Sequence, residues 1–229
     1  MKLIIASRNK HKVTEIQAIL SSVPNLEIVS LDGYVVPEII EDQDTFIGNA
    51  TKKAVETAIA VAGNTLPFGL TPPPAEPPGK IFPATALAVL ADDSGLSVDA
   101  LDGAPGVHSA YYAGQGATSQ QLCEKLLREL KGVPPENRTA RFTTVLVIAA
   151  PSVSGGAVKI LYTAEGVCEG LITEEMRGNS GFGYDPVFYY PSAKKTFAEM
   201  TAEEKNLRSH RYLALQDLLG KIKLQCDYS

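Results

Sequence analysis

Apolar residues along this chain follow two spacings, and each spacing predicts one type of secondary structure. Short runs of apolar and β-branched residues predict buried strands, while apolar residues at every third or fourth position predict amphipathic helices. The predicted strands are residues 2–6, 26–31, 86–91, 140–150 and 157–172. The predicted helices are residues 12–20, 45–61, 119–130 and 210–222, and a capping-box pattern opens residues 201–206.

Strands that alternate with helices in this order predict an α/β fold, built on a long, mixed and twisted β-sheet flanked by helices. The two long strands at 140–150 and 157–172 enclose the short loop PSVSGG, which predicts an antiparallel hairpin. The hairpin region is expected to form a second lobe, with a substrate cleft between the lobes. We therefore expect a single domain of two lobes over residues 1–229.

A proline-rich segment at residues 63–84 interrupts this pattern. Its prolines prevent regular helix or sheet and favour an extended, polyproline-like path. Such a path could serve as a PxxP ligand for a partner protein, but its composition favours an exposed insertion loop. We expect the segment to loop away from the substrate cleft.

The composition limits the classes of partner. Of the 229 residues, 45% are hydrophobic, which is enough for a core without disulfides, and the net charge of −5 disfavours nucleic-acid binding. No apolar stretch is long enough to span a membrane, and the apolar run after Met1 is too short for a signal peptide. Three cysteines, without the spacing of metal ligands, favour a reducing, cytoplasmic location.

Polar residues follow the first predicted strand and precede the first helix, in the sequence SRNKHK. Ser7, Asn9 and the lysines there lie where the N–H groups of a helix N-terminus can bind an anion. Lysine adds a positive charge suited to phosphate. The alternative is an ordinary polar loop, and this segment alone does not decide between the two.

Two adjacent carboxylates, Asp92 and Asp93, follow the apolar run ALAVLA. Neighbouring residues on an extended backbone point to opposite sides, so one of the two is expected to face a ligand. Mg²⁺ binds through one or two carboxylates and completes its shell with substrate phosphates. Glu41, ahead of the helix that carries Asn49 and Lys53, could supply a second carboxylate. The alternative is an acidic turn at the end of a strand.

Two later segments could recognise a flat, polar ligand. In GNSGFGYDPVF, Phe182 lies between glycines, which suits a loop that places an aromatic ring against a purine, although a turn with core aromatics is the alternative. In EEKNLRSHR, Lys205, His210 and Arg211 form a basic cluster at the entrance to the last helix. Arg211 could donate to a carbonyl oxygen, and His210 could be a second donor or a general acid. The alternative there is a solvated helix start.

Five segments together resemble one family, and they occur in its order from the first strand to the last helix. They are IIASRNKHKVTEI, TFIGNATKKA, ADDSGLSVDALDGAPGVHSAYYAG, GFGYDPVF and EEKNLRSHR. On these motifs the chain resembles the non-canonical purine nucleoside triphosphate pyrophosphatases, also called inosine triphosphate or XTP/dITP pyrophosphatases. The resemblance implies a homodimer that hydrolyses ITP, dITP and XTP to the nucleoside monophosphate and pyrophosphate with Mg²⁺. This activity would keep deaminated purines out of DNA and RNA.

The resemblance also implies a role for individual residues. The catalytic residue and metal ligand would be Asp93, with Glu41 as the second acidic ligand. The residues that would bind the triphosphate are Ser7, Asn9, Lys12 and Lys53, with Ser94 beside the substrate. The residues that would form the base-binding segment and complete the nucleotide pocket are Phe182, Gly183, Tyr184, Asp185, Lys205, His210 and Arg211.

The chain departs from the family pattern at two places. Arg8 stands where many members have glycine, which affects the tightness of the phosphate loop, and the segment 63–84 is longer than in compact members. Two other functions fit less well. A pyrophosphatase for pyrimidine or modified nucleotides would not need GFGYDP and SHR, and a nucleotide-binding regulator would not need both lysines beside Glu41 and Asp93.

Overall fold

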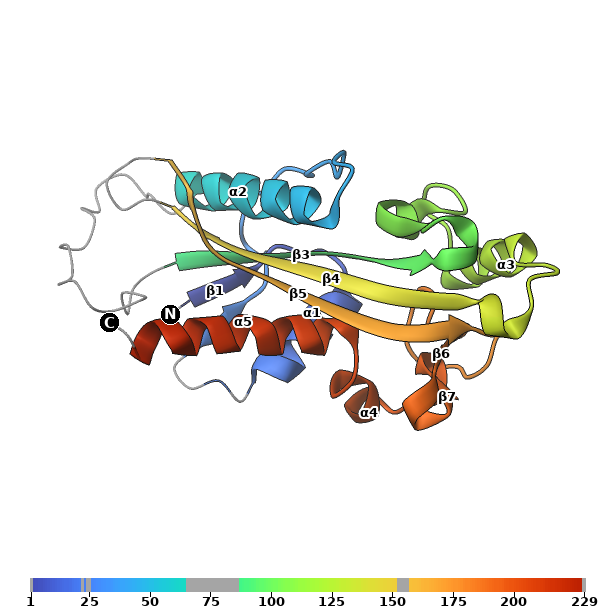
Figure 1. The fold of residues 1–229 in the computed structure, drawn as a ribbon. Helices are drawn as coiled ribbons and strands as arrows, with labels where there is room; N and C mark the ends of the chain where they lie inside the picture. Colours follow the sequence, from blue (N-terminus) through green and yellow to red (C-terminus); the bar gives the residue numbers. More distant parts are fainter. Residues whose placement is uncertain (1, 22, 24–25, 65–86, 152–156, 228–229) are drawn as a thin grey trace, which may run out of the picture. The chain divides into compact units, whose positions relative to one another are not determined.

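The computed structural model describes residues 2–21, 23, 26–64, 87–151 and 157–227 (Figure 1). The strands are β1 (Lys2–Ile5), β2 (Glu27–Val29), β3 (Leu87–Val98), β4 (Thr139–Ala150), β5 (Lys159–Ile172), β6 (Phe188–Tyr190) and β7 (Lys195–Thr196). The α-helices are α1 (Lys10–Leu20), α2 (Phe46–Asn64), α3 (Ser119–Glu129), α4 (Ala202–Asn206) and α5 (His210–Asp227). Short 3₁₀ helices are η1 (Asp99–Leu101), η2 (Gly106–Tyr111), η3 (Pro135–Asn137), η4 (Pro191–Ala193) and η5 (Phe197–Glu199).

The strands form one mixed sheet, which confirms the predicted fold class. Within the described ranges seven strands are joined in the order β2-β1-β3-β4-β5-β6-β7. β1 pairs in parallel with both β2 and β3, whereas β5–β6 and β6–β7 are antiparallel. The predicted hairpin strands, β4 and β5, are neighbours in this sheet.

The third strand is longer than predicted, and this changes where the acidic pair lies. β3 runs to Val98, so Asp92 and Asp93 lie within the strand and not in a turn after it. The prediction that the strand ends at residue 91 was wrong because buried apolar positions resume at Leu96 and Val98. The alternation of sides therefore continues through the two carboxylates.

The chain divides into two compact units. Unit 1 comprises Met1–Asp93, Val145–Glu165 and Ala214–Ser229, and unit 2 comprises Ser94–Thr144 and Gly166–Leu213. The single domain with two lobes and the cleft between them stay predictions. Residues 65–86, which include most of the predicted 63–84 insertion, lie outside the described ranges, and its first residues, 63 and 64, end α2.

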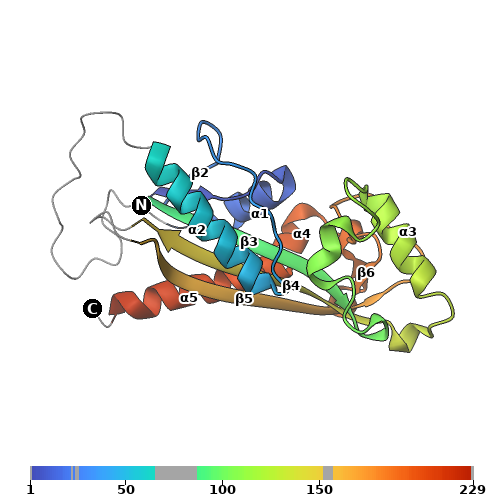
Figure 2. The ribbon, with the colours of Figure 1, turned by 90° about the horizontal axis from the view of Figure 1, so that it is seen from above.

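Unit 1 has a core on each face of its strands. One cluster joins β1, β3, β4 and β5 to α1 and α5, through residues such as Ile5, Ile16 and Leu215. The other joins β1, β3 and β4 to the small residues of α2, such as Ala50, Ala54 and Ala58. Figures 1 and 2 show α2 lying along one face of these strands, opposite α5. The small residues allow α2 to pack closely on the sheet.

Unit 2 has its own core around an aromatic cluster. The rings of Phe142, Phe188 and Phe197 pack with centroids 4.6 to 6.0 Å apart. Leu122 and Leu126 of α3 add to the same cluster, as the apolar stripe of residues 119–130 predicts.

In the part of the chain that the structure describes, none of the helices has the length and apolar character needed to span a membrane.

Candidate active site

The parallel pairing of β1 and β3 brings two predicted site segments side by side, beyond the carboxyl end of β1. Ile5 lies opposite Leu90, and the Ala6 N–H donates to the Leu90 carbonyl at 2.8 Å. The loop after β1 therefore runs beside the strand that carries Asp92 and Asp93. The predicted residues in unit 1 are Ser7, Asn9, Lys12, Glu41, Lys53 and Asp93.

Asn9 is the N-cap of α1. Its Oδ1 accepts hydrogen bonds from the His11 and Lys12 N–H groups at 3.0 and 3.4 Å, and its own N–H donates to Ser7 Oγ at 3.2 Å. Two N–H groups expected to face an anion are thus bonded to the cap itself. Arg8, at the position where many members have glycine, donates from Nη2 to the Val36 carbonyl at 2.5 Å.

The two adjacent aspartates point to opposite faces of the sheet, as predicted from strand geometry. Asp92 is ion-paired with Lys12 of α1, with Nζ 2.9 Å from Oδ2. Asp93 accepts from Asn49 of α2, with Nδ2 3.0 Å from Oδ2. Since α1 and α2 contribute to different cores of unit 1, each carboxylate is bonded from its own side.

Lys53 links the acidic pair to Glu41. Its ammonium donates to the Asp92 carbonyl at 2.9 Å and forms an ion pair with Glu41 Oε1. The Lys53 side chain is 13% exposed and that of Glu41 34% exposed. Both predicted lysines, Lys12 and Lys53, therefore reach atoms of one residue, Asp92.

Asn49, which the motifs do not identify as a site residue, is bonded to the predicted catalytic carboxylate. The signal was present, because i, i+3, i+7 spacing places Phe46, Asn49 and Lys53 on one face of a helix. What the spacing could not give was the partner of that face, which is set by the packing of α2 on β3.

Burial and neighbouring charges change the pKa values of Asp93 and Lys53. Burial raises the pKa of Asp93 and the charge of Glu41 raises it further, while Lys12, the Asn49 hydrogen bond and Lys53 act in the opposite direction. For Lys53 burial lowers the pKa, but the charges of Asp92 and Glu41 outweigh burial, so its pKa is raised. Lys53 is therefore a cation at neutral pH.

The donors of unit 1 fit a hard cation. Burial, and after it the charge of Glu41, raises the pKa of Asp93, so a cation bound by both carboxylates would offset their repulsion. Among the described residues no group of three or more His, Cys, Asp or Glu side chains could hold a metal. Two carboxylates, those of Asp93 and Glu41, would suit Mg²⁺, which needs only one or two when substrate phosphates and water supply the other oxygens.

The predicted residues in unit 2 are Ser94, Phe182, Gly183, Tyr184, Asp185, Lys205, His210 and Arg211. Lys205 and Asp185 form a buried ion pair, with Nζ 2.7 Å from Oδ2 and side chains 6% and 3% exposed. The same Oδ2 accepts from the Phe182 N–H at 2.8 Å. Gly181, at φ +77°, lets this turn close, since a Cβ there would be 2.1 Å from Asp185 Oδ2.

The basic cluster of Lys205 in α4 and His210 and Arg211 at the start of α5 is buried, so the alternative of a solvated helix start is wrong. Lys205, His210 and Arg211 are 5%, 4% and 1% exposed. The Lys205 Nζ lies 4.7 Å and the Arg211 guanidinium carbon 6.0 Å from the centroid of the Phe182 ring. Both cations are thus held near one aromatic ring.

The last two basic residues are fixed by contacts within unit 2. Arg211 Nη2 donates to Ser94 Oγ at 3.2 Å. The His210 ring stacks on Phe142 with centroids 4.6 Å apart and planes 13° apart. These contacts set the direction of each side chain before a ligand arrives.

Gly183 and Tyr184 are held by α3 and η2. The Gly183 N–H donates to Ser119 Oγ at 2.8 Å, and the Tyr184 hydroxyl donates to the Ser109 carbonyl at 2.9 Å. Tyr184 is 3% exposed, and burial raises the pKa of its hydroxyl above the ordinary range. In this structure Tyr184 packs in the core of unit 2, and its contact with a base stays a prediction.

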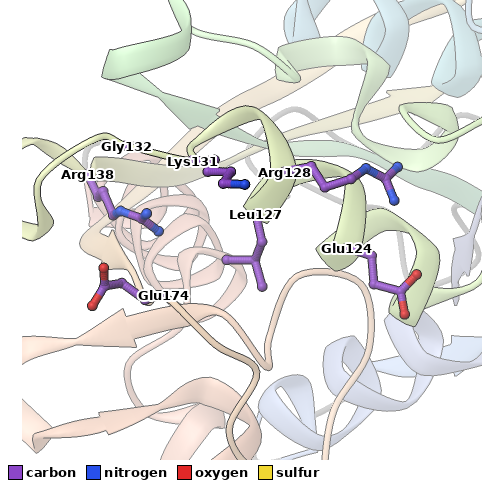
Figure 3. Close-up of a pocket in the computed structure, with 7 residues that line it drawn as sticks. All are labelled: Glu124, Leu127, Arg128, Lys131, Gly132, Arg138 and Glu174. Carbon is purple, nitrogen blue, oxygen red and sulfur yellow. The ribbon is translucent and has the colours of Figure 1, made fainter.

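Unit 2 also has a cavity of about 500 Å³ beside α3 (Figure 3). Its lining residues are Glu124, Leu127, Arg128, Lys131, Gly132, Arg138 and Glu174, none of them a predicted site residue. Arg138 uses its guanidinium to donate to the carbonyls of Leu130, Val133 and Thr173 at 2.9 to 3.0 Å. That side chain stabilises the end of α3.

Known proteins resemble this chain over nearly its whole length. A dITP/XTP pyrophosphatase of Leuconostoc mesenteroides is 48% identical over 224 residues, which cover 97% of this chain and 96% of that protein. One of Halalkalibacterium halodurans is 45% identical over 216 residues, covering 94% of this chain and 95% of that protein.

Two solved structures share the fold. A HAM1 protein from Coxiella burnetii has a TM-score of 0.74 at 34% identity, and the Staphylococcus aureus Ham1 protein has 0.74 at 30%. Each match covers 97% of this chain and 98% of the other. The model of the Ham1 family matches residues 3–221. The resemblance drawn from the five motifs is thereby confirmed, and the chain belongs to the Ham1 family.

Proposed function

We propose that this chain hydrolyses ITP, dITP and XTP to the nucleoside monophosphate and pyrophosphate, with Mg²⁺ as cofactor. By its family the chain is an enzyme, a nucleoside triphosphate pyrophosphatase. The Mg²⁺ dependence, the choice of base and the roles of single residues are the proposal. Curated relatives named dITP/XTP pyrophosphatase support the class of substrate.

One observation carries the proposal: two lysines contact Asp92, the neighbour of Asp93 on β3. Lys12 Nζ is 2.9 Å from Asp92 Oδ2, and Lys53 Nζ is 2.9 Å from the Asp92 carbonyl oxygen. Two ammonium groups beside buried carboxylates match a polyphosphate that arrives with a divalent cation.

The reaction breaks the bond between the α phosphorus and the oxygen that bridges it to the β phosphate. A water oxygen bonds to the α phosphorus, its proton passes to a base, and the bridging oxygen leaves with the pyrophosphate. Asp93 is the candidate base, and Lys12 and Lys53 stabilise the negative charge of the phosphate oxygens. Bound Mg²⁺, held by Asp93 and Glu41, would supply further charge stabilisation for the leaving group.

The hydrogen-bond donors of unit 2 support selection of the substrate by its nucleobase. Arg211 and His210 could donate to the O6 carbonyl of hypoxanthine or xanthine, and Phe182 offers an aromatic face. The 6-amino group of ATP would meet these donors with another donor, leaving buried groups without a bond. GTP shares the O6 carbonyl, so this argument does not explain its exclusion.

The remaining expectations are part of the same proposal. A homodimer that removes deaminated purines before they enter DNA or RNA follows from the family resemblance. Cys123 and Cys168 are free thiols in the structure, which supports a reducing, cytoplasmic compartment.

The test is pyrophosphate release from ITP, XTP, dITP, GTP and ATP, each with Mg²⁺ and with EDTA. We expect fast, metal-dependent release from the first three alone. Equal release from all five would agree with pyrophosphatase activity but contradict selection by the nucleobase. No release from any would favour a nucleotide-binding regulator.

A further inference from the structure

Asn49 makes two hydrogen bonds at a position where a buried amide side chain needs them. It is 2% exposed in the first turn of α2. Its Nδ2 donates to Asp93 Oδ2 at 3.0 Å, and its Oδ1 accepts from the Gln43 N–H at 2.9 Å. One side chain thus joins the predicted catalytic strand to the segment that carries Glu41.

The direction of the amide group follows from these partners. The Gln43 backbone N–H can only donate, so the oxygen of the Asn49 amide must face it. The NH₂ group then has to face Asp93, where it donates to the carboxylate. A hydrogen bond to a carboxylate is about twice as strong as one between neutral groups, so this contact fixes the orientation of Asp93.

The start of α2 is built to allow this contact. Thr45 Oγ1 accepts from the Gly48 N–H at 3.1 Å, which turns the chain into the helix. A Cβ on Gly48 would lie 2.8 Å from Gln43 Cβ, closer than side chains pack. Glycine at this position therefore lets the segment before the helix fold back until Gln43 reaches Asn49.

The same helix also positions Glu41. Lys53, one turn after Asn49, forms the ion pair with Glu41, two residues before Gln43. Glu41 is therefore held through its side chain by Lys53 and through the backbone of Gln43 by Asn49. Asp93 is held by Asn49 directly.

We propose that Asn49 is a positioning residue, which fixes Asp93 and the Glu41 segment relative to each other so that both carboxylates can bind one divalent cation. The inference rests on the proposed Mg²⁺-dependent reaction. Asn49 acts through Asp93 and needs no contact with the substrate. It should therefore affect kcat and metal affinity and leave KM nearly unchanged.

Two variants separate positioning from simple anchoring of the loop. Asn49→Ala removes both hydrogen bonds. Asn49→Asp keeps an oxygen for the Gln43 N–H but places a second carboxylate against Asp93. If Asn49 only anchored the loop, Asn49→Asp would keep wild-type kcat. If it positions Asp93, both variants should lower kcat for ITP about tenfold to a hundredfold, with KM within about threefold.

The matched control is Thr57→Val on the same helix. Thr57 is 1% exposed, and its hydroxyl has no hydrogen-bond partner in the described part of the protein, so this variant changes a buried polar side chain without breaking a bond. It should keep wild-type kcat. Far-UV circular dichroism and thermal melting establish that each variant is folded.

A second readout does not depend on turnover. Binding of Mn²⁺ alone, measured by electron paramagnetic resonance, should weaken about tenfold or more in Asn49→Ala and stay unchanged in Thr57→Val. Unchanged Mn²⁺ affinity together with unchanged kcat in Asn49→Ala would overturn the inference. If wild type and Thr57→Val release no pyrophosphate, the proposed function fails, and Mn²⁺ binding still tests Asn49.

Should the Asn49 variants not fold, Gly48→Ala answers the same question. The added methyl group favours the helix but pushes Gln43 away from Asn49. We expect kcat to fall several-fold with KM unchanged. Wild-type kcat and Mn²⁺ affinity in this variant would overturn the inference.

Discussion

The two units hold their charged site residues in different ways. In unit 1 the lysines of the two ion pairs are 17% and 13% exposed, and Lys53 is paired with a Glu41 side chain that is 34% exposed. In unit 2 the pair of Lys205 and Asp185 is almost fully buried, at 6% and 3%. In the first unit Glu41 is therefore in contact with water although Asp92 is buried, whereas both charges of the second pair are buried.

This difference predicts different consequences when a charged ligand binds. Glu41 is 34% exposed, so water can solvate its carboxylate when Lys53 exchanges it for a phosphate oxygen. A buried pair cannot exchange in this way, because a charge left alone inside the protein costs about 3–5 kcal/mol. The charges of unit 1 should serve mainly activity, and those of unit 2 should serve activity and stability together.

The largest effect is expected from Asp93→Asn. The change keeps the shape and the contact with Asn49 but removes the charge that would bind the metal and accept a proton. Turnover of ITP should fall about a thousandfold or more, while the melting temperature stays close to that of wild type. Steady-state pyrophosphate release and thermal melting check both parts, with exposed Asp32→Asn as the control. Full activity in Asp93→Asn would remove Asp93 from the site.

The next effect is on the stability of unit 2. Lys205→Met removes the ammonium group 2.7 Å from the buried carboxylate of Asp185, so the free energy of unfolding should fall by about 3–5 kcal/mol. Urea unfolding measures this. Lys195→Met is the matched control, because the pair of Lys195 and Glu204 is 42% and 41% exposed. It should lose no more than about 1 kcal/mol. Equal losses in both variants would contradict the contrast between the units.

For unit 1 the contrast predicts the opposite result. Lys53→Met should lower kcat/KM for ITP about tenfold to a hundredfold, because an ammonium group near the phosphates is lost. It should destabilise the protein less than Lys205→Met does, because the Glu41 carboxylate left behind is 34% exposed to water. Lys52→Met is the neighbouring control, since Lys52 pairs with the half-exposed Asp42 at 2.7 Å. A large loss of stability in Lys53→Met, with kcat/KM intact, would show that the lysine is structural.

Helices and strands were predictable where apolar residues recur at a regular spacing. The predicted helix at 119–130 is α3 (Ser119–Glu129), and the predicted strand at 140–150 is β4 (Thr139–Ala150). The prediction for β3 was wrong at its end, because two acidic residues look like a turn in the sequence. Their burial depends on Lys12 and Asn49, which come from helices far away along the chain.

The motifs predicted which residues form the site, but not whether their side chains are buried or exposed. The resemblance could name Lys205 and Arg211, yet nothing in EEKNLRSHR distinguishes a buried cluster from a solvated one. Their burial follows from packing beside Phe182 and from the carboxylate of Asp185, both in another segment. Asn49 shows the same limit, because its partner is set by the tertiary contact of α2 with β3.

The smallest effect concerns the two buried thiols of unit 2, which can report on that unit alone. Burial raises the pKa of Cys123 and of Cys168 to about 12. The folded thiols therefore stay protonated at pH 8, whereas in the unfolded chain they begin to ionise near pH 9. A folded pKa above the unfolded one means that the stability these groups contribute is present below about pH 9 and is lost as the pH rises toward about 12.

In a Cys226→Ser background, a thiol reagent at pH 8 should leave Cys123 and Cys168 unmodified and the activity unchanged until the protein unfolds, because only the thiolate reacts. Adding Lys205→Met should then speed labelling, since it destabilises the unit whose core holds both cysteines. Adding Lys53→Met should not. Mass spectrometry of each variant over time measures the difference. Equal labelling rates in the two lysine variants would mean that Lys205 stabilises the core of unit 2 no more than Lys53 does.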